Sequence, residues 1–114
     1  MSDEEWAENR LAVYGSLAPG QENHDQLVAL RGVWRQGTVH GSVFPLTWGE
    51  AAGYLALVLD AAGPEVAVQV FESPDLPVHW ARLDAFEGSS YWRVRTKVQT
   101  EEGLIDASIY VLAE

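Results

Sequence analysis

The sequence predicts an α+β fold in which a small, curled, mainly antiparallel or mixed β-barrel-like sheet is accompanied by one or two helices. Three observations predict it. Short apolar segments recur along the chain and are separated by turns rich in glycine, proline and acidic residues, as strands are. Only the segment 72–88 has a strong helical pattern with start and stop signals. Glycines at positions 37 and 41 interrupt a long alternating segment and predict the bends that curl a sheet.

The N-terminal part of the chain predicts a strand, a turn and a short helix. Residues 9–14 are expected to form the first strand, because the run is short, largely apolar and closed by a glycine. A turn over 19–23 follows, and residues 24–30 are expected to form a short helix with Asn23 as its cap. The side chains expected to face inward from this helix are Leu27, Val28 and Leu30.

The middle of the chain predicts extended structure. The stretch 33–46, VWRQGTVHGSVFPL, alternates apolar and polar residues and is either one bent strand or two short ones. After a loop over 47–53, the stretch 54–60 is apolar on both faces and is therefore expected to be a central strand. A turn at 61–64 leads to 65–71, which we expect to pair with 54–60 as a hairpin.

The last third of the chain predicts the main helix and two closing strands. The segment 72–88, ESPDLPVHWARLDAFEG, has candidate caps in Ser73 and Asp75, prolines only near its start, and Gly88 as a stop signal. Two alternating strands then close the chain, at 91–100 and 104–113, around a turn at 101–103.

Composition and charge narrow the class of function. The length of 114 residues suits one domain, which we place at 9–114 after a flexible acidic lead-in at 1–8. The chain has no cysteine, which excludes disulfides and thiol nucleophiles. The formal net charge of −10 argues against binding to nucleic acid or to anionic membranes. No apolar run is long enough to span a membrane and the N-terminus lacks a signal-peptide pattern, so the cytoplasm is the expected location.

Glu87 occupies an unusual position near the end of the predicted helix. Trp80, Leu83 and Glu87 follow one another at spacings of three and four residues, which places them on one helical face. Partial burial and the negative end of the helix dipole both disfavour an ionised carboxylate, so we expect a raised pKa that suits a general base near neutral pH. The alternative is a glutamate at a frayed helix end, exposed to water.

The segment LAVYGSLAPG, residues 11–20, places Gly15 and Ser16 directly behind Tyr14 and stiffens the next turn with Pro19. Two interpretations are open. One is a plain turn after a strand. The other is a concave backbone surface whose amide groups bind a small anion or a carbonyl oxygen, with Gly15 allowing close approach because it has no Cβ.

Taken together, these two segments resemble the gamma-glutamyl cyclotransferase-like family, of the gamma-glutamylamine cyclotransferase type. The residues that carry the resemblance are Tyr14-Gly15-Ser16-Leu17 after the first strand, and Leu83-Asp84-Ala85-Phe86-Glu87-Gly88 followed by Tyr91. Their order and spacing match over nearly the whole chain. The resemblance implies a small barrel-like α+β fold with the site at one mouth, Glu87 as the catalytic acid/base, and a substrate pocket lined by Tyr14, Gly15, Ser16, Leu17 and Tyr91.

The resemblance also implies a reaction. The alpha-amine of a gamma-glutamyl amide attacks the substrate's own gamma-carbonyl, which forms 5-oxoproline and releases an amine. Because the nucleophile belongs to the substrate, no serine or cysteine nucleophile is needed, and no metal or cofactor is expected. The alternative is a non-catalytic module of the same fold that binds a small molecule.

A zinc site built from histidines and a hydrolase site with a serine nucleophile are weaker candidates. The three histidines, His24, His40 and His79, are scattered and lack the spacing of a zinc site. Ser16 lacks the G-x-S-x-G surroundings of a hydrolase nucleophile.

The closing strands carry further polar side chains with two interpretations each. Arg93, Arg95 and Lys97 alternate along one strand, and they either form a solvated outer face or contact a substrate carboxylate. Tyr91 and Tyr110 either donate hydrogen bonds inside the site or are aromatic residues whose hydroxyls are satisfied elsewhere.

Overall fold

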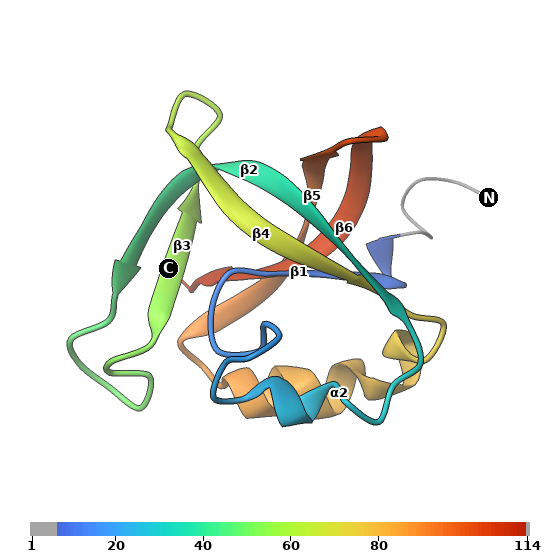
Figure 1. Cartoon of the computed structure of the whole chain (residues 1–114). Helices are drawn as coiled ribbons and strands as arrows, with labels where there is room; N and C mark the ends of the chain where they lie inside the picture. Colours follow the sequence, from blue (N-terminus) through green and yellow to red (C-terminus); the bar gives the residue numbers. More distant parts are fainter. Residues whose placement is uncertain (1–6, 114) are drawn as a thin grey trace.

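The computed structural model describes residues 7–113. Its strands form a barrel, and one long helix packs against this barrel (Figure 1). The elements follow in the order β1 (Arg10–Val13), a 3-10 helix η1 (His24–Gln26), β2 (Val33–Pro45), β3 (Leu55–Leu59), β4 (Glu65–Glu72), α2 (Leu76–Glu87), β5 (Tyr91–Thr100) and β6 (Gly103–Leu112). The main helix and both closing strands lie where the sequence predicts them.

The sheet closes on itself. Its strands are hydrogen-bonded in the order β3-β2-β4-β1-β6-β5, and an additional pairing joins β2 to β5 through Thr38 and Gln99. The pairing of β1 with β6 is parallel and the others are antiparallel, so the sheet is mixed. The predicted α+β class with a curled, mainly antiparallel or mixed barrel is therefore confirmed.

Strand β2 is one long bent strand, and it corrects two predictions about its neighbours. Its first part, up to His40, pairs with β4, and its last part, from Gly41, pairs with β3. The segments β3 and β4 therefore follow one another along β2 and do not form the predicted hairpin. Strand β3 lies at the end of the sheet order rather than in its centre. The apolar sequence predicted burial on both faces of this strand, but Leu55 and Val58 are each more than one-third exposed.

Glycine in β2 permits this bend. A Cβ built at Gly41 would lie 2.3 Å from the backbone oxygen of Val58, and one at Gly37 would lie 2.5 Å from a methyl carbon of Val98. Both distances are far shorter than van der Waals contact, so these positions require close approach of neighbouring strands.

Two apolar clusters lie on opposite faces of β1, because side chains alternate along a strand. Ala12 belongs to the cluster inside the barrel, whereas Leu11 and Val13 belong to the cluster between the sheet and α2. The helix contributes its buried residues Leu76, Trp80 and Leu83 to the second cluster. This packing fixes the position of α2 relative to the end of β1.

The ends of α2 differ in how they are stabilised. Ser73 accepts a hydrogen bond from the backbone amide of Asp75 at 3.0 Å, and the Asp75 carboxylate makes no capping bond but pairs with Arg31. At the other end Gly88 has a φ of 81°, a left-handed value that favours glycine and stops the helix.

One prediction near the N-terminus is corrected by the structure, and another lies largely outside the described residues. The short helix is a single 3-10 turn, and Val28 is 64% exposed, although Leu27 and Leu30 are buried as expected. Residues 1–6 of the predicted flexible lead-in lie outside the described residues. Ala7 is buried, and its carbonyl accepts a hydrogen bond from Ser108 at 2.7 Å.

Candidate functional site

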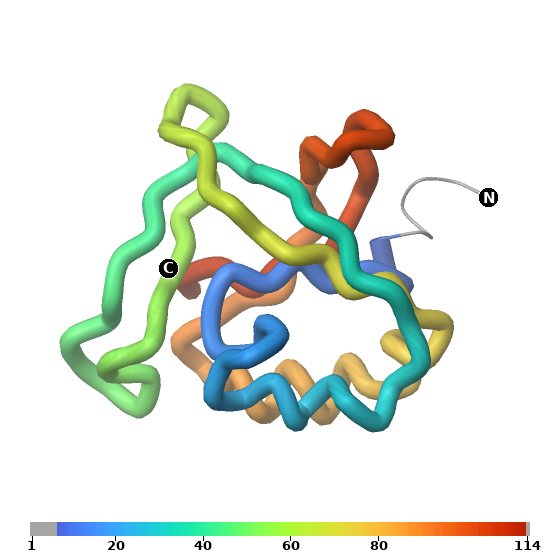
Figure 2. Tube along the Cα trace, viewed as in Figure 1, coloured from blue at the N-terminus to red at the C-terminus, as the bar shows by residue number. Residues whose placement is uncertain are grey.

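A cavity of about 250 Å³ lies between the segment that follows β1 and the C-terminal end of α2. In Figure 2 the blue segment after β1 lies beside the orange end of the helix. The cavity walls also include the loop before β3, the residues between α2 and β5, and Tyr110 from β6.

All six residues that the sequence analysis places in the site line this cavity. They are Tyr14, Gly15, Ser16, Leu17, Glu87 and Tyr91. The two segments that carry them are about seventy residues apart in the sequence, and the packing of α2 against β1 brings them together. Their roles in binding or catalysis stay predictions.

Glu87 is the last residue of α2 and is partly buried. Trp80 and Leu83, in step with it on the helix, are buried in the core as predicted. Within residues 7–113 the Glu87 side chain makes no hydrogen bond and no ion pair, so nothing compensates its carboxylate for lost hydration. Burial raises the pKa of Glu87 to about 7.

The segment 14–18 forms a tight turn that hydrogen bonds hold in place. The amide of Ala18 donates to the carbonyl of Gly15 at 3.1 Å, and the side-chain amide of Asn23 donates to the Ser16 hydroxyl oxygen at 2.9 Å. Asn23 was predicted to cap the short helix. It makes no capping bond there and instead fixes Ser16.

This turn leaves donors available. In the described part of the chain, the backbone N–H groups of Gly15, Ser16 and Leu17 have no acceptor. Consecutive free amides on a cavity wall are the kind of donor set that binds an anion or a developing oxyanion.

Gly15 is not needed by the fold itself. A Cβ built at this position meets no heavy atom within 4 Å, and its φ is not in the left-handed region. The free space beside Gly15 is therefore cavity space, which a side chain would occupy.

The tyrosines around Glu87 all direct their hydroxyl hydrogens to protein acceptors. Tyr14 donates to the backbone carbonyl of Tyr110 at 2.7 Å, Tyr91 donates to the carbonyl of Leu55 at 2.7 Å, and Tyr110 donates to Asp84 at 2.6 Å. The hydroxyls of Tyr91 and Tyr110 are thus satisfied elsewhere, as one of the two interpretations expected. Burial is the main cause that raises the pKa of each of these three phenols, and the nearby Glu87 carboxylate adds to it.

The basic side chains of β5 lie elsewhere. Arg93 pairs with Asp84 at 2.9 Å and its guanidinium lies 4.3 Å from the ring centre of Trp80. Lys97 pairs with Asp106 at 3.0 Å, and Arg95 lies 3.8 Å from Glu8. None of the three basic residues lines the cavity.

Residues 7–113 contain no side-chain arrangement suited to a metal site or to a serine nucleophile assisted by a histidine. No group of three or more histidine, aspartate or glutamate side chains there is placed to hold a metal ion. No histidine lines the described cavity wall beside Ser16. In the same part of the chain, no helix is long and apolar enough to cross a membrane.

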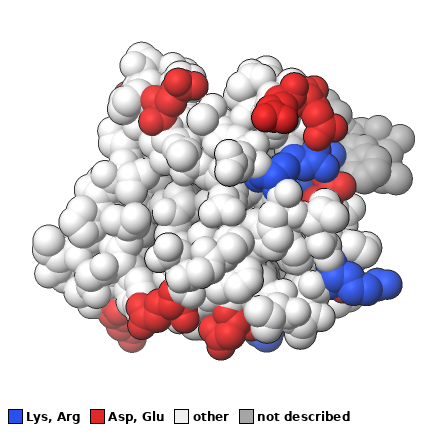
Figure 3. Space-filling view, in the orientation of Figure 1, with Lys and Arg blue, Asp and Glu red and all other residues white. Residues whose placement is uncertain are grey.

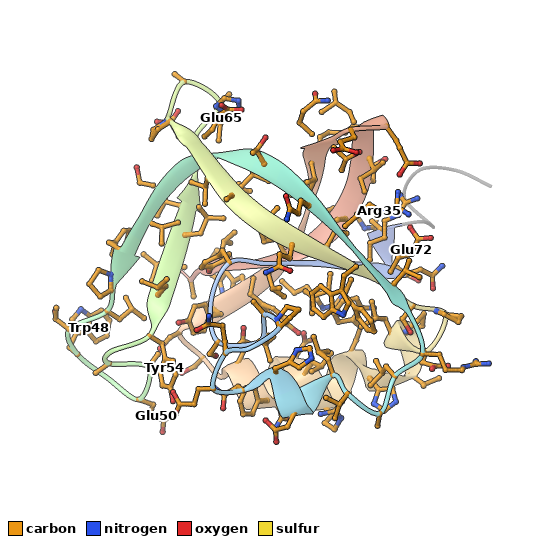
Figure 4. All side chains as sticks on the ribbon, in the orientation of Figure 1. Arg35, Trp48, Glu50, Tyr54, Glu65 and Glu72 are labelled. Carbon is orange, nitrogen blue, oxygen red and sulfur yellow. The ribbon has the colours of Figure 1, made fainter. Side chains whose placement is uncertain are left out.

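Sequence reasoning missed several cavity residues. Glu50 and Tyr54 come from the loop before β3, and both lie at that end of the β2–β3 hairpin in Figure 4. The Tyr54 hydroxyl donates to the Glu22 carboxylate at 3.5 Å. No local pattern marks these residues, because their place at the cavity depends on how the hairpin folds back.

Comparisons with known proteins agree with this geometry. The model of the family described as "Gamma-glutamyl cyclotransferase, AIG2-like" matches residues 11–114. A comparison with curated proteins finds no significant match. Among solved structures, YkqA from Bacillus subtilis is 28% identical with a TM-score of 0.70, and the match covers 91% of this chain and 35% of that one. The chain thus spans only about a third of the Bacillus protein.

Two further structures share the fold over most of their own length. An AIG2-like protein from Mus musculus is 24% identical with a TM-score of 0.71, and the match covers 92% of this chain and 77% of that one. A protein from Arabidopsis thaliana is 26% identical with a TM-score of 0.66, and the match covers 93% of this chain and 69% of that one.

Proposed function

The chain belongs to the AIG2-like gamma-glutamyl cyclotransferase family, and from this premise we propose that it cleaves a gamma-glutamyl amide into 5-oxoproline and a free amine, with Glu87 as general acid/base. The observation that carries the proposal is the position of Glu87. It is a partly buried carboxylate without a hydrogen bond or ion pair in the described residues, and it shares a cavity with the free amides of residues 15–17.

In the proposed reaction Glu87 moves one proton twice. The carboxylate removes a proton from the substrate's alpha-ammonium, and the amine nitrogen then forms a bond to the gamma-carbonyl carbon. The ring nitrogen, which is positively charged after this attack, loses its second proton to water. As the tetrahedral intermediate collapses, the bond to the leaving nitrogen breaks and Glu87 returns its proton to that nitrogen. A pKa of about 7 suits both steps, because the group is an effective base and an effective acid near neutral pH.

The amides of Gly15, Ser16 and Leu17 support the proposal from the other side of the cavity. The gamma-carbonyl oxygen gains negative charge in the transition state, and fixed N–H donors stabilise such charge without reorganising. The hydrogen bonds from Asn23 to Ser16 hold this donor set rigid before substrate binds. A small cavity also favours the folded substrate shape that brings amine and carbonyl together.

The test is a panel of gamma-glutamyl amines and gamma-glutamyl amino acids, with release of 5-oxoproline as the readout. We expect at least one member to be turned over, and Glu87→Gln to reduce kcat by about 100-fold or more. Glu50→Gln is the matched control, because Glu50 lines the same cavity but is exposed to water. It is expected to retain most of the activity.

The outcomes separate an enzyme from a binding module. Full activity of Glu87→Gln would overturn the proposed mechanism. No 5-oxoproline from any member of the panel, together with measurable binding of gamma-glutamyl compounds, would favour the non-catalytic module.

A further inference from the structure

Two consecutive residues, Asn23 and His24, hold the turn 14–18 through three hydrogen bonds. The backbone N–H of Asn23 donates to the Ser16 carbonyl at 2.7 Å, and the Asn23 side-chain amide donates to the Ser16 hydroxyl oxygen at 2.9 Å. Nδ1 of His24 lies 3.0 Å from the Leu17 carbonyl oxygen. A carbonyl can only accept, so Nδ1 carries the hydrogen of this bond.

These bonds orient the free amides because a peptide unit is planar. Its C=O and N–H groups point in opposite directions, so a partner that holds one of them also sets the direction of the other. The bond from Asn23 to the Ser16 carbonyl therefore sets the direction of the Leu17 N–H, which is one of the three free donors on the cavity wall. The bond from His24 holds the next carbonyl along the chain, that of Leu17.

His24 holds the turn from outside the cavity, whose wall it does not line. Its ring centre lies 5.6 Å from that of Trp34, and the Trp34 ring centre lies 4.8 Å from that of Phe71. Phe71 is buried in the cluster between the sheet and α2. These ring contacts connect His24 to the core, and the hydrogen bond connects the Leu17 carbonyl to His24.

The Ser16 hydroxyl keeps its own hydrogen for a ligand. A serine hydroxyl carries one hydrogen and two lone pairs. One lone pair accepts the hydrogen bond from Asn23, and within residues 7–113 the hydroxyl hydrogen has no acceptor. Because Ser16 lines the cavity, this hydrogen is available there beside the free amides of residues 15–17.

We infer that Asn23 and His24 are positioning residues for the candidate site, and that the Asn23 side chain makes the Ser16 hydroxyl a fourth donor beside the three free amides. The role of these donors rests on the proposed function, in which an oxygen gains negative charge at this wall. Donors that are fixed before the reaction stabilise such charge without reorganising. Loss of either positioning residue is therefore expected to lower kcat more than it raises KM.

The direction of the Ser16 hydroxyl is tested with Asn23→Asp. A carboxylate of the same shape only accepts, so the Ser16 hydrogen turns toward it and away from the cavity. We expect the loss of kcat caused by Asn23→Asp, measured by release of 5-oxoproline, to be at least about 10-fold larger in the wild-type chain than in a chain with Ser16→Ala. The added negative charge is present in both backgrounds, so the difference isolates the hydroxyl. Equal losses in the two backgrounds would overturn the donor role of Ser16.

Two variants separate the hydrogen bond of His24 from its ring. His24→Phe keeps an aromatic ring against Trp34 and loses the bond to Leu17, whereas His24→Asn keeps an N–H donor on Cγ and loses the ring. We expect His24→Phe to lower kcat about 10-fold and His24→Asn to stay within about threefold of the wild type. His24→Asn is nevertheless expected to have the lower thermal midpoint, because it loses the ring contact. A merely structural role would make activity follow stability instead.

His40→Phe is the matched control for these variants. Nδ1 of His40 lies 2.9 Å from the Gly63 carbonyl oxygen, so the substitution removes the same kind of hydrogen bond at a turn that does not line the cavity. We expect its kcat to stay within about twofold of the wild type. A loss as large as that of His24→Phe would contradict a specific role of His24.

Amide order parameters make the test of His24 independent of turnover. Relaxation of ¹⁵N in the ligand-free chain reports the picosecond to nanosecond motion of the N–H groups of residues 15–17. We expect values of about 0.85 in the wild type and in His24→Asn, and about 0.6 in His24→Phe. Unchanged order parameters in His24→Phe would overturn the positioning role even if 5-oxoproline is formed.

The inference and the proposed function therefore fail in different ways. Loss of order in His24→Phe, with order retained in His24→Asn, would support the inference even if no substrate of the panel is cleaved. In that case the Asn23→Asp comparison is made on the affinity for gamma-glutamyl methylamide, measured by calorimetry with and without Ser16→Ala. An equal loss of affinity in both backgrounds would again overturn the donor role of Ser16.

Discussion

At the residue scale, burial of the Glu87 carboxylate, the group that the proposed reaction uses, lowers the free energy of unfolding. The folded chain holds the Glu87 proton up to a pKa of about 7, whereas an unfolded chain loses it near the ordinary value of 4.5. Between these values the folded state binds more protons, so the contribution of Glu87 to stability falls as pH rises through this window. The full penalty, at most about 3 kcal/mol, is present above pH 7.

This penalty predicts that Glu87→Gln is more stable than the wild-type chain in alkaline buffer. A neutral amide of similar size avoids the cost, so we expect the variant to gain up to about 3 kcal/mol at pH 8 and to match the wild type near pH 4. Urea denaturation of both chains at the two pH values measures the difference, and the comparison removes the titration of other groups. A difference that is the same at both pH values would contradict a raised pKa.

How far the site could be predicted also depends on single residues. Glu87 could be predicted because its helical phase with Trp80 and Leu83 is a local property of the sequence. Asn23 could not, because its side chain serves Ser16 across a turn and not the helix beside it. The partner of Arg93 was equally hidden, since Asp84 lies on another element and the match depends on how α2 meets β5.

At the element scale, local pattern predicted the helix and most strands but not which strands pair. The β3 sequence is apolar on both faces, and this pattern usually indicates a central strand. Here Ala56 and Leu57 are buried, while Leu55 and Val58 stay partly exposed at the edge. The pairing depends on the length of β2, which accommodates β3 and β4 one after the other, and length alone does not reveal which neighbours a strand will have.

Substitution of glycine by alanine is expected to have opposite effects at position 41, in β2, and at position 15, in the segment after β1. Gly41→Ala places a methyl group against the Val58 carbonyl, so β2 and β3 must separate, and we expect the free energy of unfolding to fall by about 2 kcal/mol or more. Gly41 does not line the candidate cavity. Gly15→Ala meets open space, so stability should change by less than about 0.5 kcal/mol. Because the added methyl group occupies the cavity, we expect Gly15→Ala to lose activity instead.

Denaturation curves and 5-oxoproline assays on both variants distinguish these effects. A strongly destabilised Gly15→Ala chain would mean that the fold, and not the cavity, requires glycine at position 15.

At the scale of the whole molecule, charge is unevenly distributed. On the face shown in Figure 3, acidic side chains gather at the edges, basic ones lie to one side, and the middle is uncharged. Figure 4 places Arg35 beside Glu72, and this ion pair measures 3.4 Å. Such exposed or half-exposed pairs contribute little each, whereas the excess of acidic residues repels across the whole chain.

This balance predicts that salt stabilises the protein. Raising NaCl from about 10 mM to about 300 mM shortens the screening length from about 30 Å to less than 8 Å, which weakens long-range repulsion more than close ion pairs. We therefore expect the thermal midpoint to rise by about 2–5 °C. Glu101→Lys, in the exposed turn between β5 and β6, reduces the net charge by two and is expected to give a smaller rise. If the midpoint falls with salt in both chains, the ion pairs outweigh the net charge, and the acidity of this chain does not limit its stability.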